Sequence, residues 1–133
     1  MTDSILIVDD NSDIREMIRE VLETRTGFVV CGEASDGMDA ITKAGELRPS
    51  LIILDFSMPR MNGFEAARVL RSMMGDVVII LFTCFADMIS FSDAAAAGVN
   101  AVVSKDDLVG LIRYVQELLP ARFVADLTII TPN

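Results

Sequence analysis

The sequence predicts an α/β fold, in which a five-stranded parallel sheet carries helices on both faces as a three-layer sandwich. Short runs of aliphatic and β-branched residues, bounded by turn residues, are typical of fully buried parallel strands. Apolar stripes with helical spacing separate these runs. Polar residues stand where the strands end, at the edge of an open sheet where ligands usually bind.

The elements alternate along the whole predicted domain. We expect strands at residues 5–8, 28–33, 51–54, 77–82 and 101–103. The second strand is less apolar and should lie at an edge, whereas the fourth is the most apolar and should lie centrally. We expect helices at residues 14–22, 37–47, from 63, at 87–98 and at 108–119. Asn11, Ser12 or Asp13 could cap the first helix, Asp36 begins the second, and Pro49 and Pro120 follow two helix ends.

Composition limits the kinds of function available to this chain. A chain of 133 residues has room for one domain, and 52% hydrophobic with 23% charged residues indicates a globular protein. A net charge of −9 argues against binding nucleic acid through its phosphates. No apolar stretch is long enough to span a bilayer, and no signal segment is recognisable, so we expect a cytosolic protein without membrane attachment.

Side-chain chemistry is limited in the same way. Histidine is absent, which removes the commonest general base and metal ligand. Cys31 and Cys84 have no metal-type spacing, and we expect two reduced thiols. We expect five methionines to fill the core and loops rather than to bind a cofactor, namely Met58, Met61, Met73, Met74 and Met88.

Five polar residues follow the predicted strands and form the candidate site. They are Asp9, Asp10, Asp55, Thr83 and Lys105. Taken singly, an aspartate here could be a helix-terminal acid or a turn residue, Thr83 a local hydrogen-bonding residue, and Lys105 a surface charge. Together, three carboxylates, a hydroxyl and an ammonium at one sheet edge predict a metal-and-phosphoryl site.

At these residues the chain resembles the receiver domains of two-component response regulators, over residues 4–119. The matching segments are Ile7-Val8-Asp9-Asp10, the run from Leu54 through Met58-Pro59 to Asn62-Gly63, Phe82-Thr83-Cys84 and Ser104-Lys105-Asp106. The run from Cys31 to Gly37 is similar to receivers that carry a helix-turn-helix output domain. We therefore expect a receiver domain over residues 1–120, with 121–133 as a tail or the start of a linker.

The resemblance implies strand order 2-1-3-4-5 and a phosphoryl group on Asp55, donated by a histidine of a sensor kinase or phosphotransfer protein. A carboxylate suits that role independently, because it is ionised at neutral pH without a base. The resemblance implies Mg²⁺ as cofactor. Asp10, Asp55 and the Ser57 backbone carbonyl would be ligands, with Asp9 acting through water.

The resemblance also assigns the cation and the hydroxyl. Lys105 would pair with Asp55 before modification and with the phosphoryl group afterwards. Thr83 would move toward the phosphoryl group. Close together, the three aspartates are expected at a buried edge, where mutual repulsion raises one pKa unless a cation neutralises them.

Two positions depart from the family's pattern. Val102 stands three residues before Lys105, where receivers carry an aromatic ring that follows the threonine, so the usual coupling is in doubt. Phe85 or Phe91 could contribute instead. Asp106 follows Lys105 where many receivers have a proline after a cis peptide, and we expect a trans bond because a non-proline cis bond costs about 2.5–4 kcal/mol.

These observations favour a phosphorylation-controlled binding module, with self-catalysed phosphoryl uptake and loss rather than enzymatic turnover. Its output surface is expected within residues 88–119, for a downstream protein or a second receiver, including a homodimer. Three alternatives remain open. The chain could be a receiver excised from a DNA-binding regulator, a phosphorylation-independent adaptor, or a Mg²⁺-dependent phosphatase, although Ser57 stands where such enzymes carry a second aspartate.

Overall fold

Five parallel strands form one sheet in the order β2-β1-β3-β4-β5, which confirms the predicted doubly wound topology. The computed structural model describes residues 3–119. The strands are β1 (Ser4–Val8), β2 (Val29–Ala34), β3 (Leu51–Leu54), β4 (Val78–Thr83) and β5 (Ala101–Ser104). The edge position predicted for the second strand is confirmed, and the fourth strand lies inside the sheet, although β3 is the middle strand.

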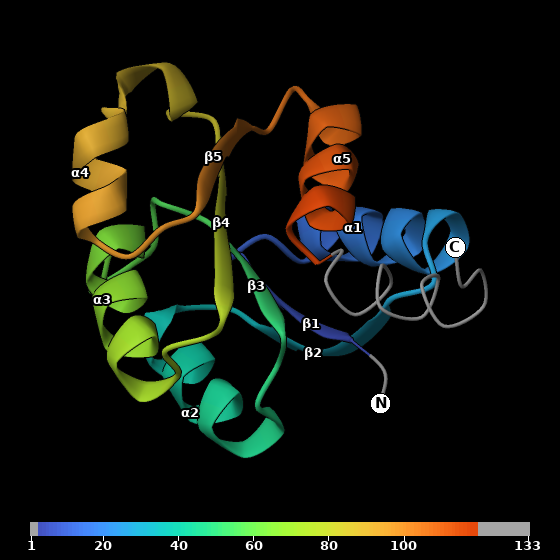
Figure 1. Cartoon of the computed structure of the whole chain (residues 1–133), viewed down its shortest axis with the longest axis horizontal. Helices are drawn as coiled ribbons and strands as arrows, with labels where there is room; N and C mark the ends of the chain where they lie inside the picture. Colours follow the sequence, from blue (N-terminus) through green and yellow to red (C-terminus); the bar gives the residue numbers. More distant parts are fainter. Residues whose placement is uncertain (1–2, 120–133) are drawn as a thin grey trace, which may run out of the picture.

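Helices cover both faces of the sheet (Figure 1). They are α1 (Ser12–Arg25), α2 (Gly37–Leu47), α3 (Gly63–Met73), the 3₁₀ turn η1 (Ala86–Met88), α4 (Phe91–Ala96) and α5 (Leu108–Leu118). Helices α1 and α5 lie on one face, and α2, α3 and α4 lie on the other (Figure 1). Within residues 3–119, no helix has the length and apolarity needed to cross a membrane.

The hydrophobic core has two layers because neighbouring residues of a strand point to opposite faces. Ile5 and Ile7 pack with the α1 and α5 residues Ile18 and Leu111, and all four are at most 1% exposed. Their neighbours Leu6 and Val8 pack in the second cluster, against the alanines and leucine of α2 and α3. Within residues 3–119 the sheet is therefore buried on both faces, which leaves its edges and strand ends as the places where a ligand could reach it.

The helix predicted for residues 87–98 is wrong in part. The chain forms η1, passes through an extended Ile89, and starts the shorter α4 after Ser90. The Ser90 hydroxyl accepts a hydrogen bond from the Asp93 N–H at 3.1 Å, which is a local N-cap that begins a new helix. Alanine-rich composition favoured one continuous helix, and this cap divides it.

The methionines are also only partly as predicted. Met58 and Met74 are buried, and Met61 and Met73 pack against the same core cluster. Met88 is 82% exposed, because it lies in η1 at the surface. Both cysteines are free, as expected. The predicted tail, residues 121–133, lies outside the described residues.

Candidate functional site

The predicted site residues meet at the carboxyl ends of the strands. Asp9 and Asp10 follow β1, Asp55 follows β3, Thr83 ends β4, and Lys105 follows β5. The strands run in parallel register, so their ends reach the same edge of the sheet. The sequence-predicted set is therefore brought together by topology.

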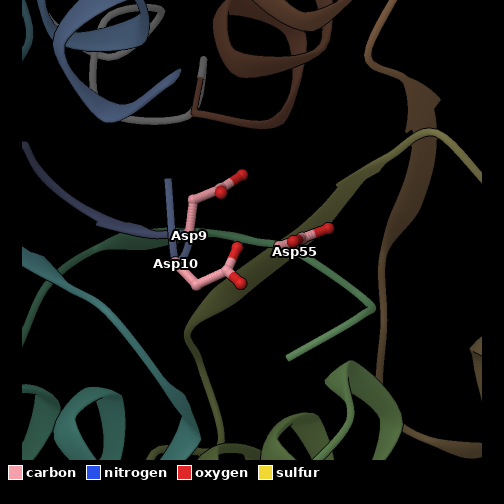
Figure 2. A group of neighbouring side chains, drawn as sticks. All are labelled: Asp9, Asp10 and Asp55. Carbon is pink, nitrogen blue, oxygen red and sulfur yellow. The ribbon is translucent and has the colours of Figure 1, made fainter. Parts of the chain in front are cut away.

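The three carboxylates form one cluster. Asp9, Asp10 and Asp55 each offer a carboxylate oxygen, and these oxygens lie within 4.8 Å of one another. Figure 2 shows the side chains of Asp9 and Asp10 directed toward the same side, where Asp55 lies on the neighbouring strand end. Asp9 is 2% exposed and Asp55 is 4% exposed. Asp10 is exposed, so the prediction of three buried-edge carboxylates is wrong for this residue, which begins the loop to α1.

Lys105 supplies the positive charge of the cluster. Its ammonium nitrogen lies 2.8 Å from Asp9 Oδ2 and 3.4 Å from Asp55 Oδ2. The ion pair with Asp55 expected from the sequence is therefore present, but the nearer carboxylate is that of Asp9. The lysine side chain is 20% exposed, so this pair is only weakly screened by solvent.

The electrostatics of the cluster follow from burial and repulsion. Burial raises the pKa of Asp55, and the charge of Asp9 raises it further; the attraction of Lys105 offsets these effects only in part. Burial lowers the pKa of Lys105, but Asp9 and Asp55 outweigh that effect, and the net pKa is raised. Lys105 is therefore charged at neutral pH, and it only partly offsets the burial of Asp55 and its repulsion by Asp9.

Thr83 is fully buried beside the cluster. Its hydroxyl oxygen accepts a hydrogen bond from the Phe85 N–H at 3.1 Å, and its carbonyl accepts one from the Lys105 N–H, also at 3.1 Å. The end of β4 is thus tied directly to the residue that carries the ammonium. A movement of Thr83 would have to give up the bond to Phe85.

The loop after Asp55 is fixed from both ends. The Asp55 N–H donates to the Val8 carbonyl at 3.0 Å, and the Gly63 N–H donates to the Phe56 carbonyl at 2.7 Å. Asn62 caps α3 and exchanges hydrogen bonds with Glu65 in a capping box. Ser57, whose backbone carbonyl is a predicted metal ligand, lies exposed within this loop.

The structure shows the surroundings of Val102 and Asp106, the two residues that depart from the family's pattern. Val102 is half-buried and packs against the core cluster on the α4 side of the sheet. The bond between Lys105 and Asp106 is trans, as expected, since no cis peptide occurs within residues 3–119. Phe85 is 40% exposed and Phe91 is 82% exposed, so both rings are accessible at the surface near β4 and α4.

Sequence reasoning missed one residue that contacts the site from outside and the carboxylate that holds it. Arg15 of α1 donates a hydrogen bond to the Asp9 carbonyl and is itself paired with Glu33 of β2. Burial raises the pKa of Glu33, but Arg19 and Arg15 outweigh it, so the net pKa is lowered. The run from Cys31 to Gly37 resembles receivers with a helix-turn-helix output domain, but its spacing does not indicate this contact.

The cluster fits a small, hard cation. Mg²⁺ prefers oxygen ligands, and opposite ligands of an octahedral ion lie about 4 Å apart. The three carboxylate oxygens lie within 4.8 Å of one another, so they are near enough to share one ion. The exposed Asp10 leaves one side open, which suits an ion that usually keeps several waters.

The fold and the carboxyl ends of its strands define a doubly wound α/β protein with an acidic, lysine-paired cluster at this edge of the sheet. Residues 5–116 match the family described as response regulator receiver domain, so the chain belongs to that family. Phosphorylation-controlled signalling is the function of the family.

Relatives and solved structures agree with this assignment. The chain is 32% identical to the chemotaxis protein CheY of Thermotoga maritima over 101 residues, covering 76% of this chain and 83% of CheY. A LuxR-family response regulator from Aurantimonas sp. has a TM-score of 0.81 at 30% identity, covering 90% of this chain and 86% of that one. TrrA of Thermotoga maritima, solved in complex with Mg(2+)-BeF, has a TM-score of 0.79 at 32% identity, covering 89% of this chain and 100% of the TrrA chain.

Other relatives are much longer than this chain. It is 34% identical over 110 residues to a protein-glutamate methylesterase/protein-glutamine glutaminase of Nocardioides sp., covering 81% of this chain but 30% of that protein. It covers 50% of the response regulator VraR of Staphylococcus aureus at 34% identity over 105 residues. The chain thus spans less than a third of the length of the first relative and half the length of the second.

Proposed function

We propose that this receiver accepts a phosphoryl group on Asp55 in a Mg²⁺-dependent reaction, and that a phosphohistidine of a sensor kinase or phosphotransfer protein donates it. One observation carries the proposal. Asp55 is 4% exposed, faces two further carboxylates within 4.8 Å and has an ammonium 3.4 Å away. Phosphoryl transfer requires positioning and charge neutralisation more than covalent assistance from the protein.

Each side chain then has a role set by its place. An Asp55 carboxylate oxygen attacks phosphorus and forms an acyl phosphate, while the P–N bond to the donor histidine breaks and its imidazole leaves. Asp10 and Asp55, with the Ser57 carbonyl, would hold the cation, and Asp9 would contribute through water and by holding Lys105. When bound, Mg²⁺ neutralises charge on the phosphoryl oxygens. Lys105 would leave Asp55 and pair with a phosphoryl oxygen, while Thr83 moves toward the same group.

Support for the cation comes from the donor set and from a relative. The three carboxylates repel one another, and the pKa of Asp55 is raised by burial and by Asp9, so a divalent ion would relieve a real cost. TrrA, at 32% identity, was solved in complex with Mg(2+)-BeF. The same kind of ion is proposed for this chain.

We propose protein partners on both sides of the reaction. The donor is a kinase or phosphotransfer histidine in the cytosol, and the output is a changed surface around η1, α4 and α5 for a downstream protein or a second receiver. Met88 and Phe91 are each 82% exposed there, which leaves apolar area available for binding. We propose that Asp55 itself takes up and loses the phosphoryl group, without turnover of a separate substrate.

A second candidate is the receiver part of a longer regulator. The chain covers half of VraR, and it resembles the receiver of a LuxR-family regulator over 90% of its length. In that case, phosphorylation would control a DNA-binding domain joined through residues 121–133. An adaptor that works without phosphorylation is favoured only by Val102. Valine has no aromatic ring that could move between exposed and buried positions when Thr83 moves.

Intact-mass spectrometry tests the proposal. The purified protein is incubated with acetyl phosphate and Mg²⁺, and we expect one phosphoryl adduct that is absent in Asp55→Asn. Asp76→Asn is the matched control, because Asp76 is exposed in the turn between α3 and β4, at the opposite edge of the sheet. An adduct that persists in Asp55→Asn would place the acceptor elsewhere and overturn the proposal.

A further inference from the structure

The backbone that carries Asp9 and Asp10 is held by an arginine from α1. Arg15 Nη1 donates a hydrogen bond to the Asp9 carbonyl at 2.6 Å. That carbonyl belongs to the peptide joining Asp9 to Asp10, so the bond fixes the plane of the peptide between two carboxylate-bearing residues. A guanidinium bound to a carbonyl from one side strongly restrains rotation of that peptide.

Glu33 fixes Arg15 in turn. Arg15 Nε donates to Glu33 Oε1 at 2.9 Å, and Arg19 Nε donates to Glu33 Oε2 at 2.8 Å. The Arg15 and Glu33 side chains are 18% and 29% exposed, so the pair is largely shielded from water. The Lys43 ammonium also donates to the Glu33 carbonyl. Arg15 therefore acts from an anchored position between β2 and the loop that follows β1.

Asp10 depends on this backbone restraint. Within residues 3–119, no hydrogen bond or ion pair holds the Asp10 carboxylate, whereas Asp9 accepts from the Asn11 N–H at 2.9 Å and from Lys105. Figure 2 shows the Asp10 side chain directed toward the side where Asp55 lies. Because the side chain has no partner of its own within residues 3–119, the placement of its backbone is the remaining restraint on where its oxygens can reach.

We infer that Arg15, anchored by Glu33, is a positioning residue for the divalent cation: it holds the Asp9–Asp10 peptide so that the Asp10 carboxylate faces Asp55. The inference rests on the proposed Mg²⁺ site. Partners that orient metal ligands without touching the ion typically change metal affinity by about 10–100-fold when they are removed.

Simple electrostatics predicts the opposite sign, which makes the inference testable. Arg15 is a cation near a cation site, so its removal without any positioning effect should leave Mg²⁺ binding unchanged or tighten it. A positioning role predicts weaker binding. Arg15→Lys separates the two effects. It keeps the positive charge but removes the guanidinium group, which donates to the Asp9 carbonyl and to Glu33 at the same time.

The experiment measures Mg²⁺ affinity of the full chain by isothermal titration calorimetry, with urea unfolding in EDTA as a check on folding. We expect the dissociation constant to rise about 10-fold in both Arg15→Met and Arg15→Lys. Glu33→Gln should weaken binding in the same direction by less. Arg19→Met is the matched control, because Arg19 bonds the same Glu33 and Glu23 but not the Asp9 carbonyl, and its affinity should stay within about twofold.

A rate measurement separates positioning from a general loss of function. Phosphorylation by acetyl phosphate in the Arg15 variants should need more Mg²⁺ for half-maximal rate but approach the wild-type rate at saturation. Wild-type affinity, or tighter binding, in Arg15→Lys would overturn the inference, as would equal losses in Arg15→Lys and Arg19→Met. Asp10→Asn tests the proposed metal site separately from the role of Arg15. If this variant binds Mg²⁺ as well as the wild type does, the proposed metal site itself is wrong.

Discussion

The ammonium of Lys105 lies closer to Asp9 than to Asp55, with distances of 2.8 and 3.4 Å to the respective Oδ2 atoms. Lys105 therefore joins two buried carboxylates rather than neutralising one. This arrangement leaves the proposed phosphoacceptor only partly engaged by the lysine. It also makes Lys105 the residue whose removal should expose the repulsion within the cluster.

Lys105→Met should destabilise the metal-free protein. Asp9 and Asp55 would face each other in a largely buried setting without their cation, which should lower the free energy of unfolding by about 1–3 kcal/mol. Urea unfolding in EDTA measures the change. Arg60→Met is the control, because Arg60 pairs with Asp36 at the surface and should contribute about 1 kcal/mol or less to that free energy. Equal losses in the two variants would contradict the special position of Lys105.

Asp55→Asn should stabilise the metal-free protein at neutral pH. The pKa of Asp55 is raised in the folded state by burial and by Asp9, so the folded protein binds this proton more tightly than the unfolded chain does. Stability from this group is therefore present at low pH and is lost as pH rises from the ordinary aspartate pKa through the raised folded value. Above that value, the ionised carboxylate carries its full cost.

The measurement is a melting curve against pH in EDTA. Asp55→Asn should melt a few degrees above the wild type at pH 7, and the difference should shrink as the pH falls toward about 4. Asp76→Asn, at the opposite edge, should show no such pH-dependent gain. A lower melting temperature for Asp55→Asn at pH 7 would show that its pairing with Lys105 outweighs burial and repulsion.

Mg²⁺ should raise the melting temperature of the unmodified protein. A ligand bound only by the folded state stabilises it by about 1.4 kcal/mol when its concentration is ten times the dissociation constant. That corresponds to several degrees for a domain of this size. Thermal unfolding in Mg²⁺ and in EDTA at matched ionic strength measures the effect, and Asp10→Asn should abolish most of it. Identical curves for the wild type in the two buffers would count against the metal site.

Gly63→Ala should disturb the loop that carries Asp55. A Cβ at this position would lie 2.8 Å from both the Asp55 carbonyl oxygen and the Phe56 Cα, which are backbone atoms that cannot simply rotate away. We expect a loss of about 1–3 kcal/mol in unfolding free energy and weaker Mg²⁺ binding. Gly75→Ala is the control, since a Cβ there meets nothing within 4 Å. Unchanged stability and affinity in Gly63→Ala would mean that this loop does not position Asp55.

Much of the fold could be predicted because local signals and the global arrangement agree. The α2 range matches its prediction, since Asp36 caps the helix and Pro49 follows it, and β3 is a fully apolar run between turn residues. The split between η1 and α4 was missed, because a single hydroxyl hydrogen bond at Ser90 outweighed alanine-rich composition. The site residues were found because strand ends are visible in sequence and parallel topology gathers them.

What the sequence could not reveal depends on side chains from different elements. Arg15 meets Glu33 across 18 positions, because α1 packs beside β2 in this register. The choice of Lys105 between Asp9 and Asp55 depends on a difference of less than 1 Å. The exposure of Asp10 follows from the loop path after β1. Patterns of residue types carry none of this information.

Mapping the phosphorylated side chain tests the central claim most directly. The protein is treated with acetyl phosphate and Mg²⁺, reduced with borohydride, which converts an aspartyl phosphate to homoserine, and digested for peptide mass spectrometry. Homoserine at position 55, and at neither position 9 nor position 10, is the predicted result. Reduction at Asp9 or Asp10, or a borohydride-resistant phosphate on Ser57 or Thr83, would contradict Asp55 as the acceptor.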